Sequence, residues 1–127
     1  MEKSEYKRVD QSIIDELAAI VGPAGVTTDA EKMAVYAHDE TSEAHYFRMP
    51  DVVVKPADAA EVAAVLKLAN RERVPVTPRG SGTGLSAGCV PMFGGIVMSM
   101  ERMNRIIEID TRNLFMVVEP AVTTGEV

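Results

Sequence analysis

Two short β-branched runs, separated by a helix-like stretch, constrain the fold of this chain more than any other feature. The runs lie at 51–54 (DVVV) and 74–77 (VPVT), and Asp58-x-x-Glu61 supplies a capping signal for a helix between them. A continuous β-branched run is typical of a strand covered on both faces. The expected apolar stripe of the helix, which should extend to about residue 71, is Val62, Val65, Leu66 and Ala69. Residues 55–73 are long enough for a crossover, so the pattern predicts a right-handed βαβ unit with parallel strands.

The preceding residues predict helices followed by a loop. Residues 11–21 place apolar side chains at helical spacing and end at Gly22-Pro23, which stops a helix. Thr28-x-x-Glu31 predicts a capping box for a shorter second helix. Residues 38–50 show no clean period and predict a loop, so residues 1–50 are interpreted as an N-terminal helical segment and loop.

The residues after the βαβ unit predict a change of strand pairing. Residues 94–100 predict a third strand, and 105–110 and 114–120 flank a turn at 111–113 that favours an antiparallel hairpin. The change falls near residue 103. The predicted fold class is therefore α+β with an α/β-like start: N-terminal helices, a βαβ parallel unit and then the start of an antiparallel sheet.

A glycine-rich loop follows the second strand of the βαβ unit. The stretch 75–88 (PVTPRGSGTGLSAG) holds Gly80, Gly82, Gly84 and Gly88. Such a loop at the carboxyl end of a parallel strand is where open α/β sheets bind ligands, and glycine lets backbone N–H groups surround an anion. A phosphate or pyrophosphate is the expected ligand. Further donors to it are expected from Arg79, Ser81, Thr83 and Ser86.

Two common phosphate-binding motifs are excluded by this loop. No Lys-Ser/Thr pair follows at the spacing that the Walker pattern requires. Gly82-Thr-Gly84-Leu-Ser-Ala87 matches a dinucleotide fingerprint, but that motif needs a helix to begin within the loop. Pro91 and Gly94-Gly95 break any helix there. The prediction is a phosphate held by loop N–H groups without a helix N-terminus.

Composition excludes several classes of protein. The 127 residues are 46% hydrophobic and 25% charged, as in an ordinary globular domain. The formal net charge of −6 and the absence of a basic run argue against nucleic-acid binding. One cysteine, a polar N-terminus without a signal peptide and the lack of a transmembrane segment favour a cytoplasmic protein. Membrane association through partners remains open.

Other polar and sulfur side chains predict no second site. His38 and His45 lie among acidic residues without a recognised metal-ligand spacing, so ordinary surface residues are expected and no metal site is predicted. Cys89 is expected to be small, buried and unreactive. The methionines of the third strand and its end are expected to fill the core: Met98, Met100 and Met103.

About residues 36–127 resemble a known family. "PRGSGTGLSAG" together with "MNRIIEID…VVEPAVT" is similar to the FAD-binding domain of the vanillyl-alcohol oxidase and p-cresol methylhydroxylase type, and most similar to its branch of glycolate oxidase FAD subunits and D-lactate dehydrogenases. The resemblance implies that 51–127 is the first part of an FAD-binding domain. Thr123-x-x-Glu126 predicts a capping box just before the sequence ends, so the expectation is a chain truncated at its C-terminus.

The resemblance also implies a set of cofactor-binding residues. Relatives with a histidyl-linked flavin have a histidine where this sequence has Thr83, which implies non-covalent FAD. Ala87 replaces a glycine of many relatives and still allows close approach. The loop residues implied to wrap the FAD pyrophosphate are Pro78, Arg79, Gly80, Ser81, Gly82, Thr83, Gly84 and Ser86. The residues implied to lie along the adenine and ribose end are Pro120, Ala121 and Val122.

The activity implied by the resemblance is that of a flavin-dependent D-2-hydroxy-acid dehydrogenase or oxidase, of glycolate or D-lactate type. Hydride would pass from substrate C2 to flavin N5, and electrons would continue to an iron-sulfur or electron-transfer flavoprotein partner or to a quinone. The catalytic base is unassigned, and this segment alone is expected to be inactive. Two alternatives stay open: a non-catalytic nucleotide- or phosphate-binding module, and another enzyme of the same FAD fold, such as a cell-wall-precursor reductase or an alkyl-ether-lipid synthase.

Overall fold

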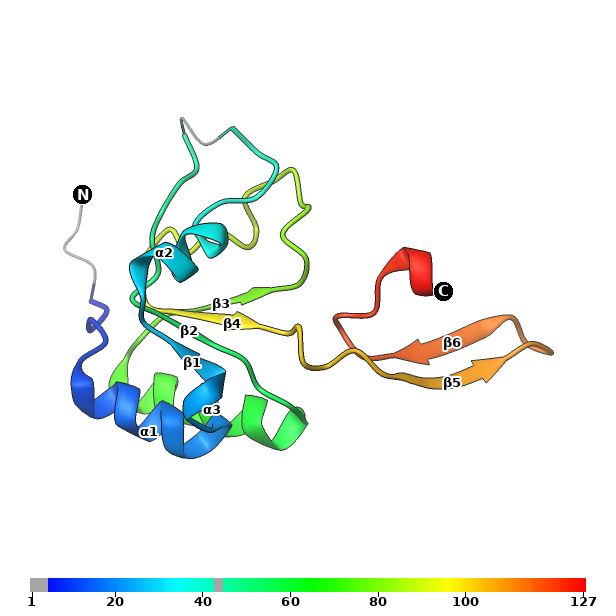
Figure 1. Ribbon diagram of the computed structural model, residues 1–127, viewed down its shortest axis with the longest axis horizontal. Coiled ribbons are helices and arrows are strands. Elements are labelled where there is room, and N and C mark those ends of the chain that lie inside the picture. The colour runs from blue at the N-terminus through cyan, green and yellow to red at the C-terminus, as the bar shows by residue number, and fades with distance from the viewer. Residues whose placement is uncertain (1–4, 43–44) are drawn as a thin grey trace.

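The computed structural model describes residues 5–42 and 45–127, and its larger part is a four-stranded sheet (Figure 1). The strands in chain order are β1 (Val26–Thr27), β2 (Val52–Val54), β3 (Val76–Arg79) and β4 (Ile96–Ser99). Their spatial order is β1-β2-β4-β3, with β2, β4 and β3 parallel and β1 antiparallel to β2. The parallel direction predicted for β2 and β3 is confirmed. The expectation that they pair with each other is wrong, because β4 lies between them.

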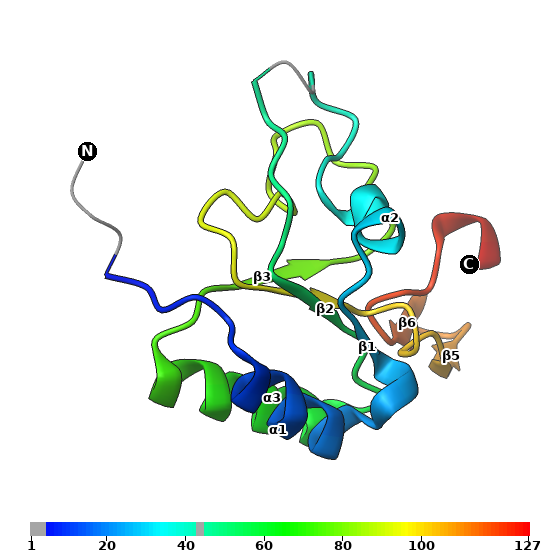
Figure 2. The same cartoon turned by 60° about the vertical axis from the view of Figure 1, so that its left-hand side comes forward.

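Two helices cover one face of this sheet (Figure 2). They are α1 (Gln11–Val21) and α3 (Ala59–Glu72), and both were predicted. Asp10 and Asp58 cap them by accepting backbone N–H bonds, and Asp58 confirms its predicted role. The buried residues that these helices share with the sheet are Ile13, Leu17, Val21, Val52, Val54, Val65, Leu68, Ala69, Val74, Ile96 and Met98.

The apolar stripe predicted for α3 is partly wrong. Val65 and Ala69 are buried, but Leu66 is 45% exposed and Leu68 takes its place in the core. The apolar face of a helix spans about 100°, and in α3 it is centred near Val65, so that it includes Leu68 and leaves Leu66 outside. The helix also continues to Glu72, one residue beyond the predicted end.

A smaller cluster packs on the other face of the sheet. It consists of Val53, Val97 and Met33, the last from α2 (Ala30–Met33). A 3₁₀ turn, η2 (Ala34–Tyr36), continues α2, and another, η1 (Pro23–Gly25), precedes β1. The capping prediction for Thr28 is wrong by one residue: the Asp29 carboxylate accepts the N–H of Lys32, because aspartate at the N-cap offers a charged acceptor.

Strand β3 begins and ends two residues later than predicted, so it includes Pro78 and Arg79. Proline is tolerated there because β3 is an edge strand of its sheet. Gly95, at the start of β4, has a φ of +74°, and a Cβ on it would lie 2.3 Å from the Pro75 carbonyl oxygen. Only glycine fits this close approach of the two strands.

The last part of the chain is the predicted antiparallel hairpin, which extends away from the four-stranded sheet (Figure 1). It pairs β5 (Ile106–Asp110) with β6 (Phe115–Val118) as a separate two-stranded sheet. Within the turn, the Asp110 carboxylate accepts the backbone N–H groups of Arg112 and Asn113. After β6 the predicted Thr123–Glu126 capping box is confirmed and begins η3 (Thr124–Glu126). Over the described ranges, none of the helices has the length and apolar character needed to cross a membrane.

Candidate functional site: the glycine loop and its buried arginine

Arg79, the last residue of β3, is the central charged group of the loop region. It is only 8% exposed, and its Nη1 donates to the carbonyl oxygen of His38 at 2.6 Å. Its guanidinium carbon lies 5.6 Å from the centre of the Tyr36 ring, a cation–π distance. No carboxylate of the described residues forms an ion pair with it. A buried cation without an anionic partner is costly, so this geometry favours an anionic ligand.

The first glycines of the loop have different relations to Arg79. Gly82 has a φ of +75°, and a Cβ there would lie 2.0 Å from Arg79 Nη2. This glycine is therefore needed so that the loop can fold over the guanidinium. Gly80 has open space where a Cβ would point. Gly80 is one of the residues that line the cavity beside the loop.

The cavity has a volume of about 430 Å³, within the usual range for ligand sites. It is bounded by the end of β3, by η2, by the turn after β4 and by the segment that follows β6. The residues that line it are Val35, Tyr36, Arg79, Gly80, Ser81, Glu101, Asn104, Ala121, Thr123 and Glu126. Segments distant in sequence thus meet where a phosphate-binding loop was predicted.

Both carboxylates of the cavity already have partners. Glu101 pairs with Lys55 and accepts from the Tyr36 hydroxyl at 3.2 Å. Burial alone would raise the pKa of Glu101, but the bond and charge of Lys55, together with bonds from Tyr36 and Ser99, hold that pKa below its ordinary value. Glu126 accepts the N–H and hydroxyl of Thr123, which lowers its pKa. Both groups are thus carboxylates at neutral pH, and Arg79 is the lining cation without a carboxylate partner in the described part of the chain.

The loop contains no helix between residues 80 and 95. Its later part is a series of tight turns, in which Val90 donates to the Ala87 carbonyl and Gly94 to the Pro91 carbonyl. The rejection of the dinucleotide fingerprint is therefore confirmed, since no helix N-terminus is available to face a phosphate. Any anion at this loop is held by backbone N–H groups, hydroxyls and Arg79.

The structure brings together some of the predicted site residues and separates others. Arg79, Gly80, Ser81 and Ala121 line the same cavity. Ala121 is fixed there because its N–H donates to the Met103 carbonyl at 2.9 Å. The remaining predicted residues are not among those that line this cavity: Pro78, Gly82, Thr83, Gly84, Ser86, Pro120 and Val122.

Several residues around the site were not expected from the sequence. Tyr36, Glu101 and Asn104 line the cavity, and no sequence motif pointed to any of the three. Asp39 and Thr41, from the predicted loop, contact the distal part of the glycine loop. An Asp-x-Thr pattern indicates a local turn, and it does not indicate contacts with a loop that is distant in the sequence.

The side chains that the sequence set aside as ordinary lie in different surroundings. No group of three or more potential metal ligands gathers in residues 5–42 and 45–127. Met98 and Met103 are buried, as expected. The expectation of a buried Cys89 is wrong: it is half-buried, because the loop turns it toward Arg79, whose Nη1 lies 3.5 Å from its sulfur.

Comparisons with known proteins show the family of this chain. Residues 50–127 match the family described as "FAD binding domain". The chain is 36% identical over 116 residues to glycolate oxidase subunit GlcD of Bacillus subtilis, covering 91% of this chain and 24% of that protein. It is 43% identical over 114 residues to a D-lactate dehydrogenase of Archaeoglobus fulgidus, covering 88% of this chain and 24% of that protein. The chain thus spans about a quarter of the length of these relatives.

Solved structures show the same fold. p-Cresol methylhydroxylase with substrate bound superposes with a TM-score of 0.80 at 23% identity, over 95% of this chain and 25% of that one. An alkyldihydroxyacetonephosphate synthase superposes with a TM-score of 0.72 at 20% identity, over 87% of this chain and 22% of that one. The predicted mixed α+β class, as the start of a domain of the p-cresol methylhydroxylase type, is confirmed.

The fold is that of p-cresol methylhydroxylase over 95% of this chain, and no helix begins within the glycine loop. The chain belongs to the FAD-binding domain family of FAD-linked oxidoreductases, related to glycolate oxidase and D-lactate dehydrogenase. FAD is the cofactor of this family, and the residues present fit it. Arg79 is a buried cation with no carboxylate partner among the described residues, and Gly80, which lines the cavity, has open space at its Cβ position.

Proposed function

We propose that this chain forms the diphosphate-binding part of the FAD site in a flavin-dependent dehydrogenase or oxidase of D-2-hydroxy acids. The observation that carries the proposal is Arg79, buried beside the open side of Gly80 and without a carboxylate partner in the described residues. A diphosphate supplies the missing negative charge, and charge-assisted bonds to guanidinium are stronger than neutral ones.

Each part of the site has a proposed role. Arg79 neutralises the diphosphate, while the backbone and hydroxyls of 80–84 and Ser86 donate to its oxygens. Ala121 and its neighbours Pro120 and Val122 form the wall along the adenosine end. Residues 1–50 are proposed as the supporting segment and 51–127 as the first part of the cofactor domain.

The cofactor supplies the redox chemistry when bound, as acceptor of the hydride that leaves C2 of the substrate. The residues of this chain bind and orient it, and their binding is non-covalent because Thr83 offers no flavin-linking imidazole. The curated relatives named above act on glycolate and D-lactate, so a small D-2-hydroxy acid is the proposed substrate class. A partner subunit or a quinone is proposed to take the electrons onward.

The proposal is tested most sharply with Gly80→Ala. A Cβ at this position meets nothing in the protein within 4 Å, so the variant should unfold at the same temperature as the wild type. In the full product of the reading frame the methyl would occupy space that the diphosphate needs. We expect FAD affinity, measured by quenching of flavin fluorescence, to fall by about tenfold or more.

Gly125→Ala is the matched control, because its Cβ also meets nothing within 4 Å and Gly125 does not line the cavity. It should bind FAD as the wild type does. Absence of flavin absorbance in the wild-type full product, even with FAD added, would contradict the proposed function. Unchanged FAD affinity in Gly80→Ala would contradict the proposal that the diphosphate binds at this loop.

A further inference from the structure

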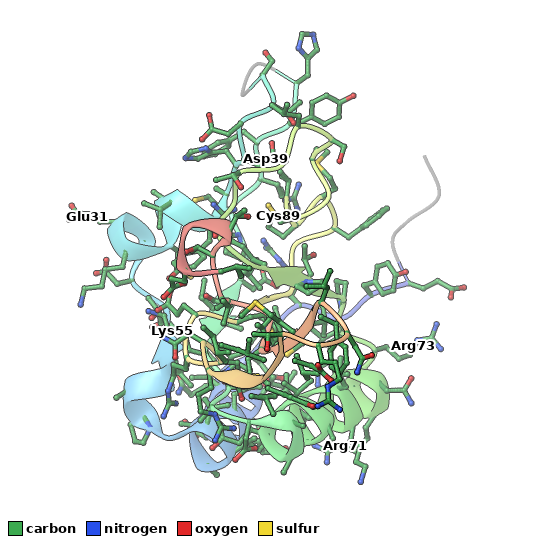
Figure 3. The ribbon with its side chains drawn as sticks, turned by 90° about the vertical axis from the view of Figure 1, so that its right-hand side faces the viewer. Glu31, Asp39, Lys55, Arg71, Arg73 and Cys89 are labelled. Atoms are coloured by element: carbon green, nitrogen blue, oxygen red, sulfur yellow. The ribbon has the colours of Figure 1, made fainter. Side chains whose placement is uncertain are left out.

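The glycine loop is held at its distal part by a short segment that precedes the region matched by the FAD-binding family. Figure 3 shows Asp39 where this segment and the glycine loop approach each other. The N–H of Glu40 donates to the Gly84 carbonyl at 3.1 Å. The N–H of Ala87 donates to the Thr41 hydroxyl at 3.2 Å. The same segment also accepts from Arg79, through the carbonyl of His38.

The bond to Thr41 acts on a residue with an unfavourable backbone conformation. Ala87 has a φ of +57°, in the left-handed region that side chains other than glycine disfavour. Because its N–H is held by Thr41, the loop keeps this conformation without a glycine. The turn that follows, from Ala87 to Val90, then starts in a fixed direction.

Asp39 gives the segment a further contact with the glycine loop. Its side chain is 5% exposed, and its Oδ1 accepts the N–H of Thr41 at 2.8 Å. Burial alone would raise the pKa of Asp39, but bonds from Thr41 and from the Ala87 backbone lower it. Its Oδ2 makes no hydrogen bond of regular geometry among the described residues, and it lies 3.5 Å from the Cβ position of Gly84. A buried polar oxygen without a partner is unfavourable. It therefore marks the place where one more donor from the loop can be accommodated.

We propose that Asp39 and Thr41 are positioning residues for the FAD diphosphate: Thr41 fixes the distal loop through Ala87, and Asp39 Oδ2 accepts a backbone N–H of the loop once the diphosphate is bound. The inference rests on the proposed function. It adds two residues, outside the matched region, that act on the cofactor through the loop and do not touch it.

Asp39→Asn separates this role from a simple charge effect, because the two predict opposite changes in FAD affinity. A buried carboxylate near a diphosphate repels it, so if Asp39 were only a nearby charge, its neutral amide would strengthen FAD binding. As an acceptor for the loop, Asp39 is needed, and the amide nitrogen cannot accept. We expect FAD affinity of the full product to fall by about 3- to 10-fold.

Thr41→Val tests the second residue and includes a measurement that needs no cofactor. Hydrogen exchange of a peptide covering residues 84–90 should become faster in the FAD-free protein, and FAD affinity should fall by about 3- to 10-fold. Thr41→Ser keeps the hydroxyl, so both the exchange rate and the FAD affinity should be close to those of the wild type. Thr111→Val, in the exposed hairpin turn, is the control and should change neither.

The outcomes are distinguishable. Tighter or unchanged FAD binding in Asp39→Asn, or unchanged exchange in Thr41→Val, overturns the inference while the proposed function stands. If the wild-type protein binds no flavin, the proposed function fails. The exchange measurement then still decides whether Thr41 holds the loop, and the positioning role toward a diphosphate is overturned with the function.

Discussion

The two sheets of this chain are built from similar apolar runs but differ in what covers them. Every residue of β2 and β4 is buried, between α1 and α3 on one face and the Met33 cluster on the other. In the hairpin, all of β5 and β6 is exposed apart from the half-buried Asp110 and Met116. Apolar strand composition therefore does not by itself decide whether a strand is buried.

Polar contacts, rather than a core, fix the base of the hairpin. Glu119 is 7% exposed and accepts the backbone N–H and the guanidinium of Arg105, at 2.8 Å from Nη2. Its own N–H donates to the Arg105 carbonyl. The stability of the four-stranded sheet should thus depend on apolar burial, and that of the hairpin on hydrogen bonds and ion pairs. Three experiments test this difference.

The largest expected difference in the free energy of unfolding is between alanine substitutions of two leucines. Leu17 of α1 is fully buried, whereas Leu114 in the hairpin turn is 88% exposed. Leu17→Ala should lower the free energy of unfolding by about 2–5 kcal/mol, because it removes apolar contacts and leaves a cavity. Leu114→Ala should change it by less than about 0.5 kcal/mol. Urea unfolding followed by circular dichroism measures both, and equal losses would show that the hairpin shares the core's cooperativity.

Sequence reasoning was strongest where local chemistry decides the structure. Asp58 capping α3, the turn at Asp110 and the Thr123–Glu126 box all depend on neighbours within a few residues, and all were predicted. The insertion of β4 between β2 and β3 was missed because strand order depends on long-range pairing. The contacts of Asp39 and Thr41 with the glycine loop were missed for the same reason, since they join segments more than 40 residues apart.

A smaller effect should come from two residues in the left-handed region. Arg73, at the C-terminus of α3, and Leu114, in the hairpin, both have a φ of +57°. Glycine relieves about 1–2 kcal/mol of strain and costs about 0.5–1 kcal/mol of unfolded-state entropy. Arg73→Gly should therefore raise global stability by about 0.5–1 kcal/mol, measured by urea unfolding.

Leu114→Gly should act only on the hairpin. It should slow amide exchange in 106–118 and leave the urea midpoint of the protein unchanged, because the hairpin opens without the sheet. The exposed ion pair of Arg73 with Glu5 is lost in Arg73→Gly, and Glu5→Gln measures that small contribution separately. A rise of the urea midpoint in Leu114→Gly would show that the two regions unfold as one.

The smallest effect should be a pH dependence confined to the hairpin. Bonds from the Arg105 side chain and backbone hold the pKa of Glu119 below its ordinary value of 4.5. A carboxyl group whose pKa is lower in the folded state stabilises the fold fully when the pH is above its unfolded-state pKa. This stabilisation is lost as the pH falls through the folded-state pKa. Asp110, whose pKa is lowered by Asn113, titrates in the same acidic region. Amide chemical shifts of 106–118 should therefore stay constant from neutral pH down to about 4.5 and change below it. Asp110→Asn should remove the change at the turn amides of Arg112 and Asn113, whose N–H bonds the Asp110 carboxylate accepts. Glu119→Gln should remove the change at the Arg105 amide, at the base of the hairpin, and leave that of the turn. A change at the Arg105 amide that persists in Glu119→Gln would show that other groups hold the base of the hairpin.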